Sequence, residues 1–265
     1  MFRQRPPIMY QPTVTLLDTA NSVTDGASFT FSAMNLGGMS GTAPLNSLET
    51  TVANDNPLLA VPGRKVILCI VHLEDSATNF GVTSVTIGGV AGTEELDRGG
   101  GTTAINTAMY LWRSEQLAAI ANTDVIVTPT ETCTACAVGV LEIDNVRSSR
   151  STAEGIAQTA GDINISTGIN TDVGIIGGVV IMGISCVTGG GTETPSFINR
   201  TASTPPLDAF EPDTLYFGNN AELDFAAAVF QSPTVFFYSG LAARQGVGAN
   251  WSGAGGGDGN AIYIV

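Results

Sequence analysis

The sequence predicts an all-β protein, an antiparallel β-sandwich of jelly-roll-like type with long loops. Short β-branched or aromatic runs alternate in polarity along the chain, and clusters of Gly, Asn, Asp and Pro separate them at intervals of about 8 to 12 residues. The 32 glycines indicate turns and bulges, because glycine disfavours a helix interior by about 1 kcal/mol relative to alanine. No alternation of strands and helices is visible, so a parallel sheet is not expected.

The first strand expectations follow the chain from its N-terminal side. Residues 13–18 and 28–33 are expected to pair, because the turn-rich segment NSVTDG joins them. Residues 35–56 form a connection rich in Gly, Ser, Thr and Asn, which is long enough to be an interaction loop. Residues 65–74, KVILCIVHLE, are almost continuously apolar and predict an interior strand with both faces covered.

The later segments continue the same pattern. Residues 82–90, VTSVTIGGV, end in a Gly-Gly turn, so the following TEELD is expected to be their hairpin partner. Residues 107–114 are expected to pair back into the same sheet, and SEQLAAIAN predicts a helix of about two turns. Residues 135–146 predict a second interior strand. Further strands are expected at residues 124–129, 162–166, 174–187, 224–230, 234–242 and 260–265.

Charge is sparse and acidic. Only 13% of the residues are charged, roughly half of the usual fraction of about 25%. A surface poor in charge is typical of a protein that is covered by other protein, so we expect an assembled state and a homo-oligomer. The net charge of −14 disfavours nucleic acid and membrane lipid as partners. A monomeric secreted β-protein rich in Thr and Asn remains the alternative.

A short basic and apolar segment precedes the first strand. Its prolines restrict it to extended conformations, so residues 1–12 are interpreted as an attachment arm and residues 13–265 as the sandwich. The chain is long for one domain, which leaves room for a second, smaller β subdomain in residues 150–265. We expect the cationic and apolar side chains of the arm to bind a partner: Phe2, Arg3, Arg5, Ile8 and Tyr10.

The four cysteines do not predict a metal or redox site. Cys133 and Cys136 are close in sequence, but one C-x-x-C pair and a single histidine do not complete a zinc site. The strand-like AVGVLEI after Cys136 does not fit the helix of a thioredoxin-like motif. Cys69 and Cys186 lie in apolar runs and are interpreted as buried free thiols. A disulfide between Cys133 and Cys136 is left open.

One group combines a histidine with carboxylates. His72 and Glu74 share a face of an extended strand, and Asp75 follows, which permits an acid–base pair or a metal ligand set. A lone histidine at the end of a core strand is more often packed or solvated. The sequence has no G-x-S-x-G motif that would use such a base. We therefore expect no catalytic residue, no metal and no cofactor.

Two carboxylate pairs are the candidates for glycan hydrolysis. Glu94 with Glu95, and Glu211 with Asp213, would need to face each other across a sugar. Solvated loop acids are the favoured interpretation. A hydrolase would need an aromatic-lined cleft, for which the available side chains are Trp112, Tyr216, Phe217 and Trp251. A lectin-like module would stack sugar rings on Tyr110, Trp112, Tyr216 or Trp251.

The C-terminal segment WSGAGGGDGN is rich in glycine. It has neither the Lys nor the following Ser or Thr that a phosphate-binding loop requires. Asp258 and Asn260 could offer oxygens to calcium, but their spacing does not match an EF-hand loop. A flexible hairpin turn that leads into the last strand is the favoured interpretation.

The order of several segments resembles a known group of proteins. HLEDS, VTSVTIGGVAGTE, MYLWR, DVIVT and ACAVGVLEIDNV follow one another between about residues 53 and 146. This order resembles β-sandwich structural proteins of tailed bacteriophages and gene transfer agents. The resemblance is one of strand and turn style, and no functional residue is carried over from it.

The resemblance implies a virion component that is made in the cytoplasm of the bacterial host. A capsid decoration or cement protein is favoured over a spike, fibre or tail module, because long repeats and coiled-coil stretches are absent from the sequence. The implied partners are the major capsid protein or the tail and spike subunits. The alternatives are a lectin-like module that binds host surface glycans and, third, a glycan hydrolase.

Overall fold

The structure is a computed structural model that describes residues 12–36, 64–75, 80–97, 104–117, 119–146, 149–157, 161–170, 179–187, 196–199, 211–231, 244–251 and 257–264. The first elements are β1 (Thr13–Ser22), β2 (Phe29–Phe31), β3 (Arg64–Glu74), β4 (Val82–Ile87), β5 (Val90–Ala91), β6 (Thr93–Asp97), β7 (Ile105–Trp112), α1 (Ser114–Leu117), β8 (Val125–Pro129) and β9 (Ala135–Val146). The later ones are β10 (Ser149–Ala157), β11 (Gly161–Asn170), β12 (Val179–Val187), β13 (Ser196–Asn199), β14 (Glu211–Asn219), β15 (Leu223–Gln231), β16 (Arg244–Trp251) and β17 (Gly257–Ile264).

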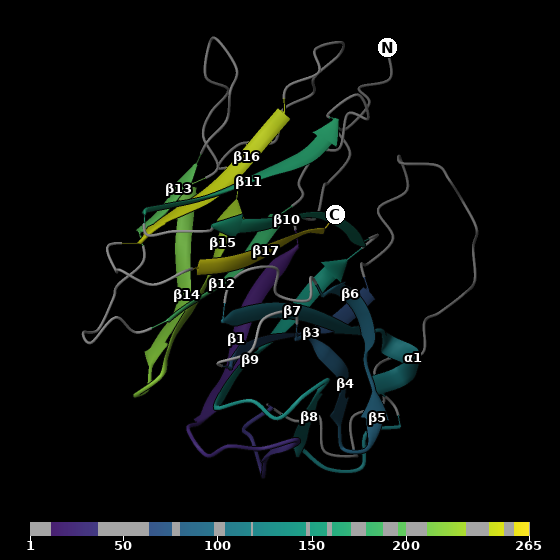
Figure 1. Ribbon diagram of the computed structural model, residues 1–265. Helices are drawn as coiled ribbons and strands as arrows, with labels where there is room; N and C mark the ends of the chain where they lie inside the picture. Colours follow the sequence, from purple (N-terminus) through teal and green to yellow (C-terminus); the bar gives the residue numbers. More distant parts are fainter. Residues whose placement is uncertain are drawn as a thin grey trace, which may run out of the picture.

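These strands form stacked antiparallel sheets (Figure 1). The lower sheet has the strand order β2-β8-β4-β5, and the central sheet has the order β1-β9-β3-β7-β6. The upper sheet has the order β10-β17-β12-β15-β14, and the outer sheet has the order β11-β16-β13. The predicted all-β, antiparallel sandwich class is confirmed, and the jelly-roll connectivity stays a prediction.

The central sheet is apolar on both faces. Along β3, Ile67, Cys69 and Val71 face a core shared with the lower sheet, whereas Val66 and Leu68 face a core shared with the upper sheet. A strand covered on both sides cannot alternate between apolar and polar residues, which explains the continuous apolar run. Because β3 lies between β9 and β7, and β9 lies between β1 and β3, both predicted interior strands are confirmed.

Two predicted strand pairings are wrong. The turn at Gly88 and Gly89, with φ of 54° and 82°, joins β4 to β5 only. The TEELD segment is β6, which leaves this hairpin and pairs with β7 in the central sheet. In the same way β1 pairs with β9 and β2 pairs with β8, so the first two strands do not pair with each other. Local turn residues identified the bends, but tertiary packing decided which strands meet.

The remaining expectations have mixed outcomes. The short helix is present as the four residues of α1. The predicted strand at 234–242 lies outside the described residues, as do residues 1–11 of the attachment arm and most of the loop at 35–56. The upper and outer sheets are built from β10 to β17. Whether residues 150–265 form a subdomain stays a prediction.

Candidate functional site

A cluster of polar side chains is buried between the central and upper sheets. It comes from three strands of the upper sheet and two of the central sheet, and its members are His72, Thr107, Ser185, Tyr216, Asp258 and Asn260. We call it the interface cluster. Five of these residues are at most 1% exposed, and Tyr216 is 7% exposed. Buried polar groups destabilise a fold unless they form hydrogen bonds, so the contacts of the cluster decide its role.

His72 joins the two sheets through both of its ring nitrogens. Nδ1 lies 2.9 Å from the Ser185 hydroxyl oxygen, and Nε2 lies 2.9 Å from the Tyr216 hydroxyl oxygen. Complete burial lowers the pKa of His72 to about 3, against an upward contribution from a backbone hydrogen bond at Ile184. The imidazole is therefore neutral at physiological pH, with one nitrogen donating and the other accepting.

Thr107 continues the network toward β17. Its hydroxyl oxygen lies 2.7 Å from that of Ser185 and donates to the Asp258 carbonyl oxygen at 3.1 Å. Its backbone N–H donates to Oδ2 of Asp258 at 2.6 Å. The side-chain amide of Asn260 donates to the Thr107 carbonyl oxygen. A continuous chain of polar contacts thus runs from Tyr216 through His72, Ser185 and Thr107 to Asp258.

A serine hydroxyl beside a histidine is also the arrangement of an activated nucleophile. Here both His72 and Ser185 are fully buried, and the Ser185 hydroxyl is shared between His72 and Thr107. These contacts use the hydroxyl and the imidazole to connect two sheets. The geometry therefore fits internal support better than attack on a substrate.

Glycines make room for the cluster. A Cβ at Gly139 on β9 would collide with the ring of Tyr216, and a Cβ at Gly183 on β12 would lie 2.5 Å from Ile70 Cγ2. Both glycines lie in the middle of long strands, where glycine weakens a sheet unless something approaches closely. At these positions the close approach of the central and upper sheets requires glycine.

The predicted grouping of His72 with Glu74 and Asp75 has a different form in the structure. Glu74 is 8% exposed and follows His72 on the same face of β3. Burial, followed by the nearby charges of Glu222 and Asp75, raises the pKa of Glu74 to about 7. His72 contacts hydroxyl groups across the interface, so it is packed in the core, which is the favoured interpretation, and its ring nitrogens bind Ser185 and Tyr216 in place of the carboxylates.

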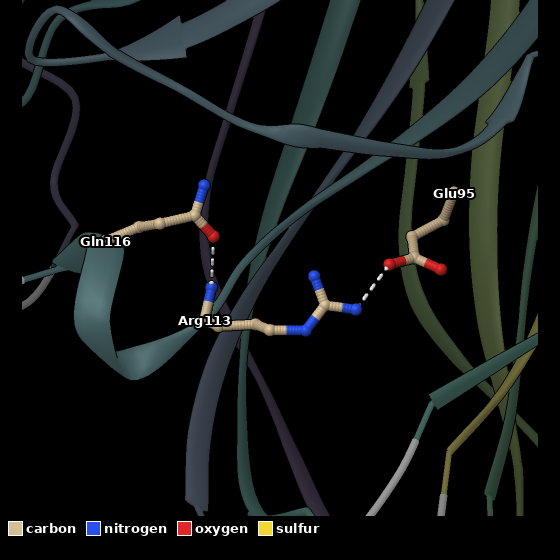
Figure 2. A network of polar contacts seen from close by, with 3 residues as sticks. All are labelled: Glu95, Arg113 and Gln116. Atoms are coloured by element: carbon tan, nitrogen blue, oxygen red, sulfur yellow. Dashed lines mark hydrogen bonds and ion pairs between the residues drawn. The ribbon is translucent and has the colours of Figure 1, made fainter.

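The Glu94–Glu95 pair is divided between two contacts. Oε1 of Glu95 forms an ion pair with Arg113 at 3.0 Å (Figure 2). Glu94 accepts a long hydrogen bond of 3.4 Å from the Tyr110 hydroxyl. Adjacent residues of the edge strand β6 thus hold different partners and do not face each other across an opening.

Arg113 also caps helix α1. Oε1 of Gln116 accepts a hydrogen bond from the Arg113 backbone N–H at 2.9 Å (Figure 2). This is the contact that a Gln at the third helical position makes with the capping residue. Nε2 of Gln116 donates to the Ala91 carbonyl oxygen at 3.0 Å, so the short helix is attached to β5. The network of Figure 2 supports the fold at this corner.

The structure also shows where the second carboxylate pair and the candidate sugar-stacking aromatic residues lie. Asp213 is exposed on β14, while the side chain of Glu211 lies outside the described set. Tyr110 is 2% exposed and Trp112 is fully buried, and they donate to the carbonyl oxygens of Val82 and Val90. With Tyr216 inside the interface cluster, the interpretation of these three aromatic residues as sugar-stacking groups is wrong. The side chain of Trp251 is not described.

The cysteines are buried free thiols, as expected for Cys69 and Cys186 and also found for Cys133 and Cys136. Burial raises the pKa of Cys69 to about 12 and, together with the charges of Asp75 and Glu131, that of Cys133 to about 12. The thiols of Cys69 and Cys133 are therefore protonated and poor nucleophiles. Within the described ranges, no three His, Cys, Asp or Glu side chains gather as metal ligands would.

Sequence reasoning missed the interface cluster. Asp258 was expected in a flexible turn and Asn260 at the start of the last strand, but both lie within β17 and are buried. Thr107 and Ser185 carried no motif. The available signal was a polar residue in the middle of an apolar run, as at Ser185 within VVIMGISCV. Such a residue indicates a buried hydrogen bond but does not name its partner.

The proposed partner-binding residues Phe2, Arg3, Arg5, Ile8 and Tyr10 lie outside the described residues. In the part of the chain that is described, none of the helices has the length and apolar character to cross a membrane.

No protein-family model, curated protein or solved structure matches this chain.

Proposed function

We propose that this chain is a non-enzymatic structural protein of a bacteriophage-like virion, of the capsid decoration or cement type. The interface cluster carries the structural part of this proposal. It contains the chain's one histidine, and that histidine, the nearest hydroxyl groups and a carboxylate are all engaged in joining two sheets. Side chains that could perform general acid–base chemistry are thus used for cohesion.

The virion part of the proposal rests on the sequence. The order of segments between about residues 53 and 146 resembles phage structural β-sandwiches, and the charged fraction of 13% suits a protein whose surface meets other proteins. The proposed partners are the major capsid protein or the tail and spike subunits. A lectin-like role is less well supported, because Tyr110, Trp112 and Tyr216 are buried.

Incorporation into particles tests this function. Particles from the genome that encodes the chain are purified on a density gradient with and without the gene, and the protein content and heat resistance of the capsids are compared. We expect the chain to co-sediment with heads in a fixed ratio, and heads that lack it to open at lower temperature. A chain that stays in the soluble fraction while complete particles form would overturn the proposal.

Deletion of the attachment arm is a second comparison in the same experiment. Deleting residues 1–12 should leave the melting temperature of the sandwich within a few degrees while greatly reducing its incorporation. A matched control replaces Arg3 and Arg5 by Lys, which keeps the charge but removes the planar, two-pronged hydrogen bonding of arginine. Normal incorporation of the shortened chain would place the docking surface elsewhere.

A further inference from the structure

The carboxyl group of Glu74 lies at one end of the interface between the central and upper sheets. Glu74 is the last residue of β3 and shares a strand face with His72, which contacts the upper sheet. It is 8% exposed, and among the described residues its Oε2 is buried without a hydrogen-bond partner. A carboxylate in this place would lose its water without gaining donors, so ionisation is unfavourable while this end of the interface stays closed.

The carboxylates nearest to Glu74 carry like charge. After burial, the strongest influences that raise the pKa of Glu74 are the negative charges of Glu222 and then of Asp75. Asp75 follows Glu74 in the chain, whereas Glu222 belongs to the turn between β14 and β15. The two cationic side chains that the structure describes, Lys65 and Arg113, form ion pairs with other carboxylates. Among the described side chains, no cation therefore offsets these like charges.

The other titratable groups around this end of β3 have partners or face away from the interface. Tyr216 of β14 binds the imidazole two residues before Glu74, and Asp258 of β17 binds the backbone of β7. Asp224 lies on β15 between two residues that face the central sheet, so its own side chain points away from that sheet. Cys133 lies in the core shared with the lower sheet, and Glu131 is exposed.

The β14–β15 hairpin is the side of this contact that can move. The carbonyl oxygen of Glu74 accepts the N–H and the hydroxyl of Thr134 at 2.9 and 3.0 Å, and β3 is paired with β7 and β9 on its two sides. β14, in contrast, is an edge strand. In the turn, Oδ1 of Asn220 accepts the N–H groups of Glu222 at 3.0 Å and of the next residue at 2.7 Å, so the turn can move as one unit.

We propose that Glu74 is a pH-sensitive switch that controls the contact between the β14–β15 hairpin and the central sheet. With Glu74 protonated, the hairpin stays closed through the contact of Tyr216 with His72 and the packing of Phe225 on the imidazole, with 5.4 Å between the ring centres. An ionised Glu74 requires water and is repelled by Glu222, so the turn end of the hairpin separates from β3. Opening should increase from pH 4.5 to about 7, because the exposed acid ionises before the buried one.

Hydrogen exchange of the full chain tests the switch. The exchange rate of residues 216–225 is measured by mass spectrometry from pH 5 to 8, and the rate in wild type is divided by that in Glu74→Gln. This ratio should rise about tenfold or more. Taking the ratio cancels the intrinsic pH dependence of exchange and the opposite effect of His72. Glu222→Gln should give a smaller rise, because burial remains while the repulsion is lost. Asp213→Asn, an exposed carboxylate of β14, is the matched control and should behave like wild type.

A thiol probe distinguishes hairpin opening from global unfolding. Ala135 pairs with Glu74 across β3 and β9 and is fully buried toward the upper sheet. Maleimide labelling of Ala135→Cys, divided by labelling of the same variant with Glu74→Gln, should also rise with pH, whereas Cys69 and Cys136 in the other core should stay protected. A constant exchange ratio, or labelling of Cys69 and Cys136 in step with the probe, would overturn the proposal. The isolated chain is measured, so the result does not depend on the proposed virion role.

Discussion

His72 and Ser185 face each other across the interface between the central and upper sheets, with 2.9 Å between Nδ1 and the hydroxyl oxygen. They are 113 residues apart in sequence. The contact is buried and continues through Thr107 and Tyr216, so it fixes how the two sheets are positioned. Buried polar networks of this kind are stable only when they are well satisfied, which makes the interface cluster sensitive to small changes.

Removing the Tyr216 hydroxyl should weaken the interface. Tyr216→Phe keeps the ring but leaves Nε2 of His72 without its partner at 2.9 Å. We expect the free energy of unfolding to fall by about 1–2 kcal/mol, measured by urea denaturation. The control is Thr214→Ala, an exposed position on the same strand, which should change stability by less than about 0.5 kcal/mol. If Tyr216→Phe and wild type were equally stable, this hydrogen bond would make no net contribution to the free energy of unfolding.

Acid should destabilise the fold through His72. Its pKa falls from 6.5 to about 3 on folding, so the unfolded chain binds the proton first as the pH decreases below 6.5. Stability is therefore complete above this pH and declines by about 1.4 kcal/mol per pH unit once the unfolded histidine is protonated. His72→Gln should be less stable than wild type at pH 7. Between pH 6.5 and 5, however, its free energy of unfolding should not show the decline that His72 causes in the wild type. Parallel stability curves for variant and wild type would contradict the prediction.

Glu74 should lower the stability of the fold as the pH rises, whereas His72 lowers it as the pH falls. Its pKa rises from 4.5 to about 7 on folding, so the folded state holds the proton more tightly. The resulting stability is complete below pH 4.5 and is lost as the pH rises through 7. Glu74→Gln should therefore raise the melting temperature relative to wild type more at pH 8 than at pH 4.5. If the difference is the same at both pH values, Glu74 is ionised in the folded protein at neutral pH.

A methyl group at Gly139 should disturb the packing of Tyr216. Gly139→Ala places a Cβ against the tyrosine ring, and overpacking of this kind costs about 1–3 kcal/mol. The double variant Gly139→Ala/Tyr216→Ala removes the ring, so it should lose less stability than the two single variants added together. Strict additivity in chemical denaturation would show that the two residues are not coupled.

An aspartate in either interior strand should prevent folding. Ile67 on β3 and Val140 on β9 are fully buried and face the core shared with the lower sheet. Ile67→Asp or Val140→Asp would bury a charge without a partner, so we expect insoluble protein. Thr13→Asp on the exposed face of β1 is the matched control and should remain soluble. Wild-type-like melting of either core variant would contradict the strand assignment.

Local patterns in the sequence determined the β class and the interior strands. The run KVILCIVHLE indicated a strand covered on both faces, because successive side chains of a strand point to opposite faces and those of residues 66–71 are all apolar. Gly88 and Gly89 identified a turn, since glycine adopts positive φ without a steric penalty. These features depend on neighbours along the chain, so they can be recognised without knowing the fold.

Tertiary structure alone decided which strands meet and which polar groups become partners. TEELD followed a hairpin turn, yet β6 joined the central sheet, because pairing with β7 extends a sheet whose apolar faces are covered by two others. Asp258 binds the backbone of Thr107 across 151 residues of sequence. The energy of such a contact depends on burial and on distances that arise only when the sheets stack, so no local pattern could indicate it.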